Sequence, residues 1–216
     1  MSRSKQQSYD KPRSLGGDVE WADTPRSHAP FEGDVDALRR NLAERVRGEV
    51  RFDGGSKAIY STDASNYREV PIGVVLPHDP DDIAATIAVC HEHGAPVTNR
   101  GGGTSLAGQC CNHAVIIDSS KYCDEILEIN PEEGYARVEP GVRRDQLASI
   151  TEERYNLTFA PDTSTHEYAT FGGMIGNNAC GMHSQMARRT QDNVEAMEVV
   201  LYDGTLLREG PTSEEE

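Results

Sequence analysis

The sequence predicts an α+β domain with two lobes. Between residues 73 and 120, apolar runs alternate with one amphipathic helical pattern, which is typical of βαβ units. Two later stretches, 125–141 and 193–210, each place alternating segments around a turn, which indicates antiparallel hairpins. The length of 216 residues allows one large domain or two small lobes with a real core.

A helix is expected over 34–48, where apolar residues recur at helical spacing and Asp34 can cap the N-terminus. The residues that would share the buried face are Val35, Leu38, Leu42 and Val46. Gly48 can end this helix. The segment "EVRFD", residues 49–53, is then a candidate strand.

The following unit reads as strand, helix, strand, glycine loop and strand. The first strand contains the apolar run 72–76. Asp79, followed by Pro80, indicates the start of a helix. Gly94 ends that helix, and "APVTN" (95–99) is the next strand. After the glycine loop, "AVIIDSS" (114–120) has the apolar run of a buried strand.

The second lobe begins with the hairpin 125–141, followed by an amphipathic helix over 142–156. A second hairpin turns at Asp203-Gly204. We expect lobes at about 34–118 and 119–210, with an N-terminal extension (1–33) that is disordered or loosely docked and an acidic tail (211–216). Because the chain stops just after a strand, its continuation is expected to be missing or to lie in another chain.

Charge and composition exclude several classes of protein. The chain has 21 basic and 36 acidic residues, a net charge of −15, which argues against nucleic acid and anionic membranes as partners. No apolar run resembles a signal peptide or a membrane span, so a cytoplasmic location is expected. The cysteines form no CxxC pair, which favours reduced, mostly buried thiols and no metal site. They are Cys90, Cys110, Cys111, Cys123 and Cys180.

The first glycine loop, "TNRGGGTSLAGQ" (98–109), follows a predicted strand. A backbone almost without side chains can approach a ligand, and its amides can converge on an anion, so a phosphate cradle is predicted. Neither GxxxxGK[ST] nor GxGxxG is present. The alternative is an ordinary tight turn, but three consecutive glycines lose much entropy on folding, which favours binding. The candidate ligand-binding residues are Arg100, Gly101, Gly102, Gly103, Thr104, Ser105, Gly108 and Gln109.

The second glycine loop, "PDTSTHEYATFGGMIGNNACGMHSQ" (161–185), is longer. Its small residues allow close approach, while its Asn and Ser side chains suit a ligand with phosphates, ribityl hydroxyls and a heteroaromatic ring. The alternative is a structural Ω-loop packed by its own side chains. Two such loops favour one shared ligand.

Four stretches in order carry a family resemblance: "NRGGGTSLAGQ", "VEPGV", the second glycine loop and "DNVEAMEVVLYDG". Together they resemble the FAD-binding domain of the FAD-linked oxidases, the vanillyl-alcohol oxidase or p-cresol methylhydroxylase type. The likeness covers roughly residues 55–208 and is greatest to the branch of D-lactate, glycolate and D-2-hydroxyglutarate dehydrogenases. It implies a two-lobed FAD-binding domain of this type, without the C-terminal substrate (cap) domain. Carbohydrate-active and cell-wall reductase branches fit less well.

The resemblance also implies which residues bind FAD. Gly101, Gly102, Gly103 and Thr104 would wrap the pyrophosphate through their amides, with Ser105 nearby. The second loop would line the rest of the flavin nucleotide through Pro161, Asp162, Thr170, Gly172, Gly173, Gly176, Asn177, Asn178, His183 and Ser184. Val199 would lie near the adenine. Covalent members of the family have His where Thr104 stands, so non-covalent FAD is expected.

The implied function is the FAD-binding portion of a flavoprotein oxidoreductase that oxidises a D-2-hydroxy acid by hydride transfer to flavin N5. Partners would include a substrate-domain chain or an iron–sulfur or other electron acceptor. The alternative is a truncated, catalytically silent FAD-binding domain or a gene remnant. The proton-abstracting groups of the family come largely from parts that this sequence does not contain, so no catalytic residue is assigned.

Overall fold

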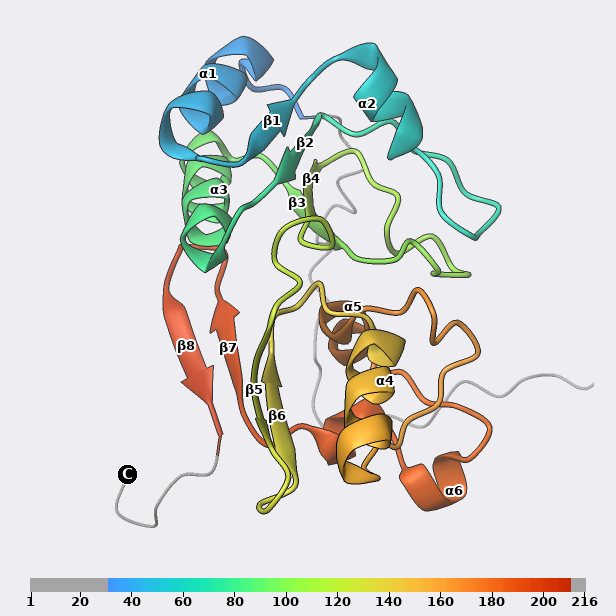
Figure 1. Cartoon of the computed structure of the whole chain (residues 1–216). Helices are drawn as coiled ribbons and strands as arrows, with labels where there is room; N and C mark the ends of the chain where they lie inside the picture. The colour runs from blue at the N-terminus through green and yellow to red at the C-terminus, as the bar shows by residue number, and fades with distance from the viewer. Residues whose placement is uncertain (1–30, 211–216) are drawn as a thin grey trace, which may run out of the picture. The chain divides into compact units, whose positions relative to one another are not determined.

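The computed structural model describes residues 31–210, which belong to one compact unit (Figure 1). The expectations for residues 1–30 and 211–216 lie outside the described residues. The described chain contains helices α1 (Val35–Arg45), α2 (Gly54–Ile59), α3 (Pro80–His93), α4 (Arg144–Tyr155), α5 (Phe171–Gly176) and α6 (Ser184–Ala187), and a 3-10 helix, η1 (Thr190–Asn193). Its strands are β1 (Glu49–Arg51), β2 (Gly73–Leu76), β3 (Val97–Arg100), β4 (Val115–Asp118), β5 (Ile126–Asn130), β6 (Tyr135–Val138), β7 (Met197–Val200) and β8 (Leu206–Glu209).

A four-stranded sheet in the order β1-β2-β4-β3 forms the first lobe together with α1, α2 and α3. Strands β2 and β3 are both parallel to β4, whereas β1 is antiparallel to β2. The carboxyl ends of the three parallel strands therefore lie at the same edge of the sheet. The segment that follows β3 at this edge is the first glycine loop.

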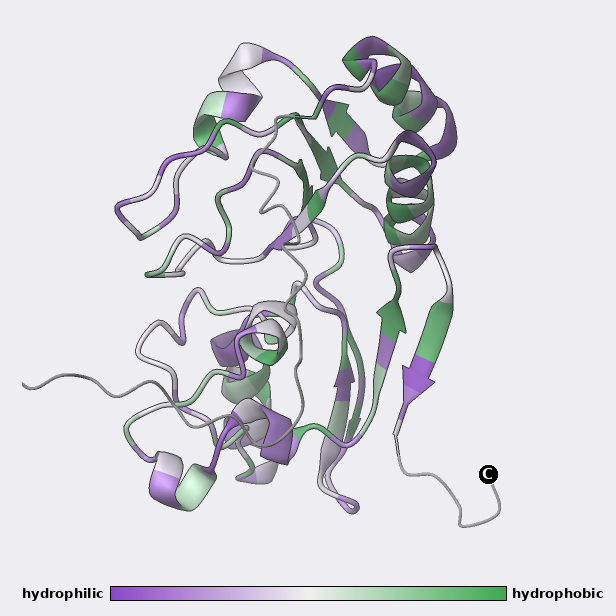
Figure 2. Cartoon of the chain, turned by 180° about the vertical axis from the view of Figure 1, so that it is seen from behind, coloured by the Kyte–Doolittle hydropathy of each residue, from purple (hydrophilic) through white to green (hydrophobic). Residues whose placement is uncertain are grey.

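Helices α1 and α3 form where the sequence predicts, but α1 ends at Arg45, with Val46 already extended, rather than at Gly48, and Val35 is exposed. Asp34 and Asp79 cap α1 and α3 by accepting hydrogen bonds from the amides of Ala37 and Asp82. Gly94 ends α3 in a left-handed conformation, as predicted. Figure 2 shows stripes of apolar and polar residues along α1 and α3, and a mostly apolar β2.

The apolar stripes of α1 and α3 pack on one face of the sheet. This cluster contains Leu38, Leu42, Val46, Ile72, Val75, Val89, Cys90, Ala95 and Val115. The opposite face carries a smaller cluster of Val74, Leu76 and Ile116, against which Tyr60 and Tyr122 pack. Burial on both faces explains why β2 and β4 are continuous apolar runs.

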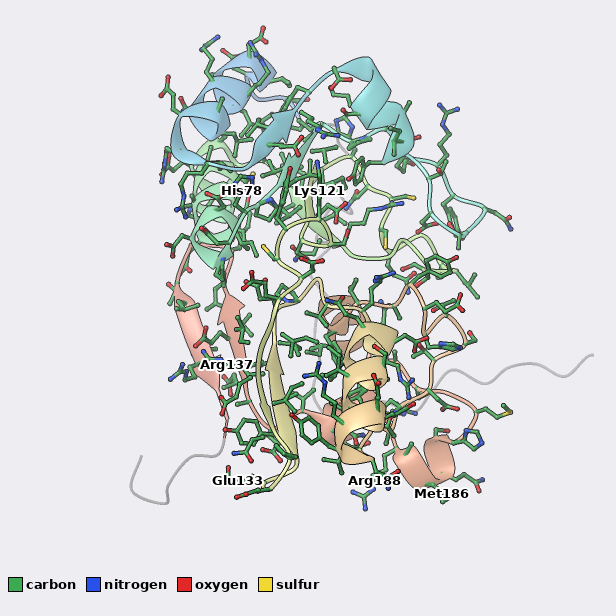
Figure 3. All side chains as sticks on the ribbon, in the orientation of Figure 1. His78, Lys121, Glu133, Arg137, Met186 and Arg188 are labelled. Atoms are coloured by element: carbon green, nitrogen blue, oxygen red, sulfur yellow. The ribbon has the colours of Figure 1, made fainter. Side chains whose placement is uncertain are left out.

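The second lobe is built on the predicted hairpins β5–β6 and β7–β8, both antiparallel. Helix α4 and the start of α5 pack on the first hairpin through Val142, Leu147 and Phe171. Arg137 on β6 donates to Glu198 on β7 (3.5 Å), so the two hairpins contact each other (Figure 3). The mixture of parallel and antiparallel strands confirms the α+β class.

Four short elements were not predicted: α2, α5, α6 and η1. Each has four to six residues, which is too short for a helical hydrophobic period to appear. Helix α5 lies within the second glycine loop, where a propensity argument disfavours helix because of its glycines. Within 31–210, no helix is long and apolar enough to cross a membrane.

Glu49 on β1 joins strand β1 to the segment after β4. Its carboxylate accepts hydrogen bonds from Lys121 Nζ (2.5 Å), Tyr122 Oη (2.6 Å) and Arg51 Nε (2.8 Å). Figure 3 shows Lys121 beside this part of the sheet. These hydrogen bonds, led by that from Lys121, lower the pKa of Glu49 to about 2.

We predict that Glu49→Gln lowers the melting temperature at pH 7 by on the order of 2–4 °C, since a partly exposed cluster contributes about 1 kcal/mol. Because the folded pKa is below the unfolded one, the Glu49 contribution is present above about pH 4.3 and is lost as the pH falls toward 2. Thermal melts of both proteins from pH 7 to 2 should therefore converge at low pH. A constant difference down to pH 2 would contradict this role of Glu49.

Candidate functional site

The first glycine loop begins at the carboxyl end of β3, beside the end of β4. Ligands of open parallel sheets bind at such edges, outside the carboxyl ends of the strands. Gly102 from this loop and Ser120, two residues after β4, line the same cavity of about 310 Å³. The sheet topology therefore places the loop where a cofactor site is expected.

The backbone of the loop is free to bind a ligand. Among the described residues, the amides of Gly102, Gly103, Thr104 and Ser105 have no hydrogen-bond partner. Gly103 has a φ of 65°, a conformation that glycine adopts without strain, and its carbonyl accepts from the amide of Ala64 (3.1 Å). Several adjacent amides that lack acceptors are what an anion-binding loop requires.

Arg100, the last residue of β3, places a half-buried cation beside this loop. Its guanidinium lies over the ring of Tyr60 (5.4 Å to the centroid) and next to Gly103, where an added Cβ would be 2.6 Å from Arg100 Nη2. The Nη1 atom is buried and has no partner within the described chain. A buried guanidinium nitrogen without an acceptor is costly, and an anion would satisfy it.

Tyr60 is itself fixed, which holds Arg100 in place. The Tyr60 hydroxyl donates to Asp118 Oδ2 (2.6 Å), and Asp118 Oδ1 accepts from the amide and hydroxyl of Ser120. Burial, followed by the hydrogen bond to Asp118, raises the pKa of Tyr60. Sequence reasoning missed Tyr60 because it lies 40 residues before Arg100 and no local pattern connects them.

The second glycine loop, which contains α5, is fastened to the start of α4 and to the segment just before it. The amide of Arg144 donates to Ala169 O (2.9 Å), and the amide of Phe171 donates to Val142 O (2.9 Å). Thr170 is 2% exposed and caps α5 by accepting from the amide of Gly173. The loop is therefore well supported next to the first lobe.

The two glycine loops touch each other. A Cβ on Gly101 would lie 2.1 Å from Thr170 Oγ1, and one on Gly102 would lie 2.2 Å from Tyr168 O. The side chain of Gln109 also donates to Asn177 Oδ1 (3.1 Å). Positions 101 and 102 therefore require glycine partly because the two loops touch there. The sequence alone did not reveal this reason.

The other predicted residues of the second loop make contacts within the chain or lie at its ends. Gly172 packs against Pro140, and Asn178 pairs with Gln191 through two hydrogen bonds (2.7 and 3.1 Å), so both support the second loop. His183 Nδ1 donates to Asp162 Oδ2 (2.5 Å), which lowers the pKa of Asp162. Ser184 begins α6, Pro161 is buried, and an added Cβ on Gly176 would meet no described atom within 4 Å.

Ser105, Gly108 and Val199 complete the predicted set. Ser105 Oγ lies 3.1 Å from Cys110 Sγ, and Gly108, with a φ of 78°, packs against Tyr67. Val199 lies opposite Leu207 in the second hairpin, within β7 rather than in either loop. All five cysteines are free, and only Cys180 is exposed.

These residues fit a dinucleotide with a pyrophosphate. The loop offers unpaired amides, and Arg100 offers an unpaired buried donor, while the bare glycines leave the backbone accessible. Arg100, Gly102, Gly103, Thr104 and Ser105 would hold the phosphates. The side-chain amides of Asn177 and Asn178, by contrast, already hydrogen-bond to Gln109, Gly173 and Gln191 and so shape the second loop.

The fold and its paired glycine loops define a nucleotide-cofactor domain, and comparison with known proteins identifies its family. A family model described as "FAD binding domain" matches residues 71–210, and the chain belongs to this family, with FAD as its cofactor. D-2-hydroxyglutarate dehydrogenase of Escherichia coli is 38% identical over 167 residues, which are 76% of this chain and 16% of that protein. Glycolate oxidase subunit GlcD of Bacillus subtilis is 34% identical over 170 residues, 77% of this chain and 36% of that protein.

Solved structures show the same fold. p-Cresol methylhydroxylase with substrate bound superposes with a TM-score of 0.65 at 22% identity, over 80% of this chain and 35% of that one. The 4-ethylphenol oxidase of Gulosibacter chungangensis gives a TM-score of 0.68 at 23% identity, over 86% and 38% of the two chains. The fold is therefore that of the p-cresol methylhydroxylase type, as the sequence predicts. The chain spans between about a sixth and about a third of these proteins.

We predict that Gly102→Val abolishes FAD retention, because the branched side chain would collide with Tyr168 O and occupy the approach to the loop. Absorbance at 450 nm relative to 280 nm of the purified variant measures retention. Gly54→Val is the matched control, since an added Cβ at Gly54 meets nothing within 4 Å and lies in α2. If folded Gly102→Val retains stoichiometric FAD, the first loop is not the cradle.

We predict that Arg100→Leu weakens FAD binding about tenfold to a hundredfold, which is the value of a charge-assisted hydrogen bond of about 1.5–3 kcal/mol. The dissociation constant is measured by flavin fluorescence titration of the apoprotein. Arg154→Leu, which removes an exposed arginine of α4, controls for net charge. Equal affinities for the two variants would show that Arg100 does not bind the cofactor.

Proposed function

We propose that this chain is the FAD-binding portion of a flavoprotein oxidoreductase that oxidises a D-2-hydroxy acid of the lactate, glycolate or 2-hydroxyglutarate type. The observation that supports this most is that relatives named D-2-hydroxyglutarate dehydrogenase and glycolate oxidase subunit match across 76–82% of the chain. The matching family model spans both glycine loops. FAD, when bound, would accept a hydride from the substrate at N5. The role of this chain is to bind FAD and to orient it.

In this proposal, the two glycine loops bind different parts of FAD. The first loop, with Arg100, would bind the pyrophosphate, and the second loop, from Pro161 to Ser184, would contact the rest of the flavin nucleotide. We also propose that the two lobes comprise residues 34–118 and 119–210 and that Val199 contacts the adenine. Thr104 carries no imidazole for a covalent flavin bond, which supports non-covalent FAD.

The proposed reaction also requires a substrate domain and an electron acceptor. A substrate domain would supply the proton-abstracting group, and an iron–sulfur protein or another acceptor would take the electrons. We place the protein in the cytoplasm, which is supported by its bacterial relatives and by the buried, unpaired state of four of its five thiols.

We predict that the purified chain is yellow and that acid precipitation releases its flavin into the supernatant as FAD. The visible spectrum before and after precipitation, with chromatographic identification of the released flavin, measures this. Colour that stays in the pellet would contradict non-covalent binding. A chain that stays colourless after incubation with added FAD would contradict the proposed function and would support the alternative of a gene remnant.

A further inference from the structure

Residues 61–70 form a loop that lies against the first glycine loop and is part of neither glycine loop; we call it the 61–70 loop. It follows α2 and leads to β2 (Figure 1). Thr62 and Arg68 form an antiparallel bridge, and the amide of Glu69 donates to Ser61 O (3.0 Å), so the two ends of the loop are joined. The matched family domain begins at residue 71, just after this loop.

The 61–70 loop contacts the first glycine loop at two glycines. The amide of Ala64 donates to Gly103 O (3.1 Å). The ring of Tyr67 packs on Gly108, where an added Cβ would lie 2.8 Å from Tyr67 Cδ2. Gly103 and Gly108 have φ angles of 65° and 78°, so the contacts fall where the backbone of the first loop is left-handed.

The hydrogen bond to Gly103 O sets the direction of the next amide. Gly103 O and the N–H of Thr104 belong to one planar peptide, and in a trans peptide the carbonyl and the N–H point in opposite directions. Because Gly103 O points to Ala64, the Thr104 N–H points away from the 61–70 loop. That amide has no hydrogen-bond partner among the described residues, so it is free to donate to a ligand.

Asp63 fixes the turn that presents the Ala64 amide. Its Oδ1 atom accepts from the amide of Ser65 (2.8 Å), which forms an Asx turn around Ala64. Burial raises the pKa of the Asp63 carboxyl, but the hydroxyl and amide of Ser65, the amide of Cys110 and the thiol of Cys111 lower it overall. Asp63 is therefore ionised at neutral pH and faces the residues that directly follow the first glycine loop.

We propose that Asp63 and Ala64 are positioning residues of the cofactor site, which hold the peptide after Gly103 so that its N–H is directed at the FAD pyrophosphate. This inference rests on the proposed function and adds the 61–70 loop to the parts of the chain that prepare the site. Three consecutive glycines allow many backbone conformations, so an unsupported loop would lose much entropy when it closes on an anion. A restraint from outside the loop removes part of that loss before FAD binds.

Two variants test this role through FAD affinity, measured by flavin fluorescence titration of the full chain without bound flavin. Ala64→Pro removes the amide that donates to Gly103 O, and Asp63→Ala removes the Asx turn; each should raise the FAD dissociation constant about tenfold. Asp203→Ala is the matched control, because Asp203 Oδ1 accepts from the amide of Thr205 (2.9 Å) in the same type of turn, within the last hairpin. Its FAD affinity should equal that of the parent. Circular dichroism establishes that each variant is folded.

Phosphorus NMR of bound FAD separates the positioning of one amide from a general loss of stability. Each protein is saturated with FAD, so that differences in affinity do not affect the spectrum. We expect the pyrophosphate signals to shift in Asp63→Ala and Ala64→Pro and to coincide with those of the parent in Asp203→Ala. The visible absorption band of the flavin should be the same in all four proteins, because the two residues act at the pyrophosphate.

The proposal is overturned if folded Asp63→Ala binds FAD as tightly as Asp203→Ala does, or if its phosphorus signals match those of the parent. The same results for folded Ala64→Pro overturn it too, and if Ala64→Pro does not fold, Asp63→Ala decides. In a chain that binds FAD, such results refute only this inference. A parent chain that binds no FAD refutes the proposed function, and this inference with it.

Discussion

The site depends on one steric constraint: the backbones of two loops, about 70 residues apart in sequence, pass within contact distance of each other. Gly101 and Gly102 have no side chain, and the space that a Cβ would need is taken by Thr170 and by the carbonyl of Tyr168. Thr170 must also be small and polar, because it caps α5 while it touches Gly101. Each loop thus limits the residues that the other can contain.

This constraint is effective because both loops have rigid supports. The first loop begins at β3, which is held in a sheet with helices packed on one face, and the second loop is hydrogen-bonded to Arg144 at the start of α4 and to Val142 before it. Arg100 is supported in the same way. Its guanidinium lies over the ring of Tyr60, and Tyr60 is fixed by its hydrogen bond to Asp118. The groups that we propose to bind the cofactor are therefore fixed before it arrives, which reduces the entropy lost on binding.

The sequence predicted the elements whose signals are local. The caps at Asp34 and Asp79, the stop at Gly94 and the hairpin turn at Asp203-Gly204 were all indicated by single residues in known contexts, and the structure confirms them. It could not predict α5, because its glycines disfavour a helix and the packing of Gly172 against Pro140 joins distant segments. Nor could it predict that Arg100 lies over Tyr60, because that contact joins distant segments.

The contacts between the two lobes differ from one place to another. At Tyr202, the hydroxyl donates to Ala95 O (2.8 Å) and the ring packs against His91, so the turn of the last hairpin is fixed to the end of α3. At the loops, by contrast, the side-chain hydrogen bond between the lobes joins two exposed amides, Gln109 and Asn177. Exposed hydrogen bonds open at the lowest free energy. We therefore expect the hydrogen bond at Gln109 to open more readily than the one at Tyr202.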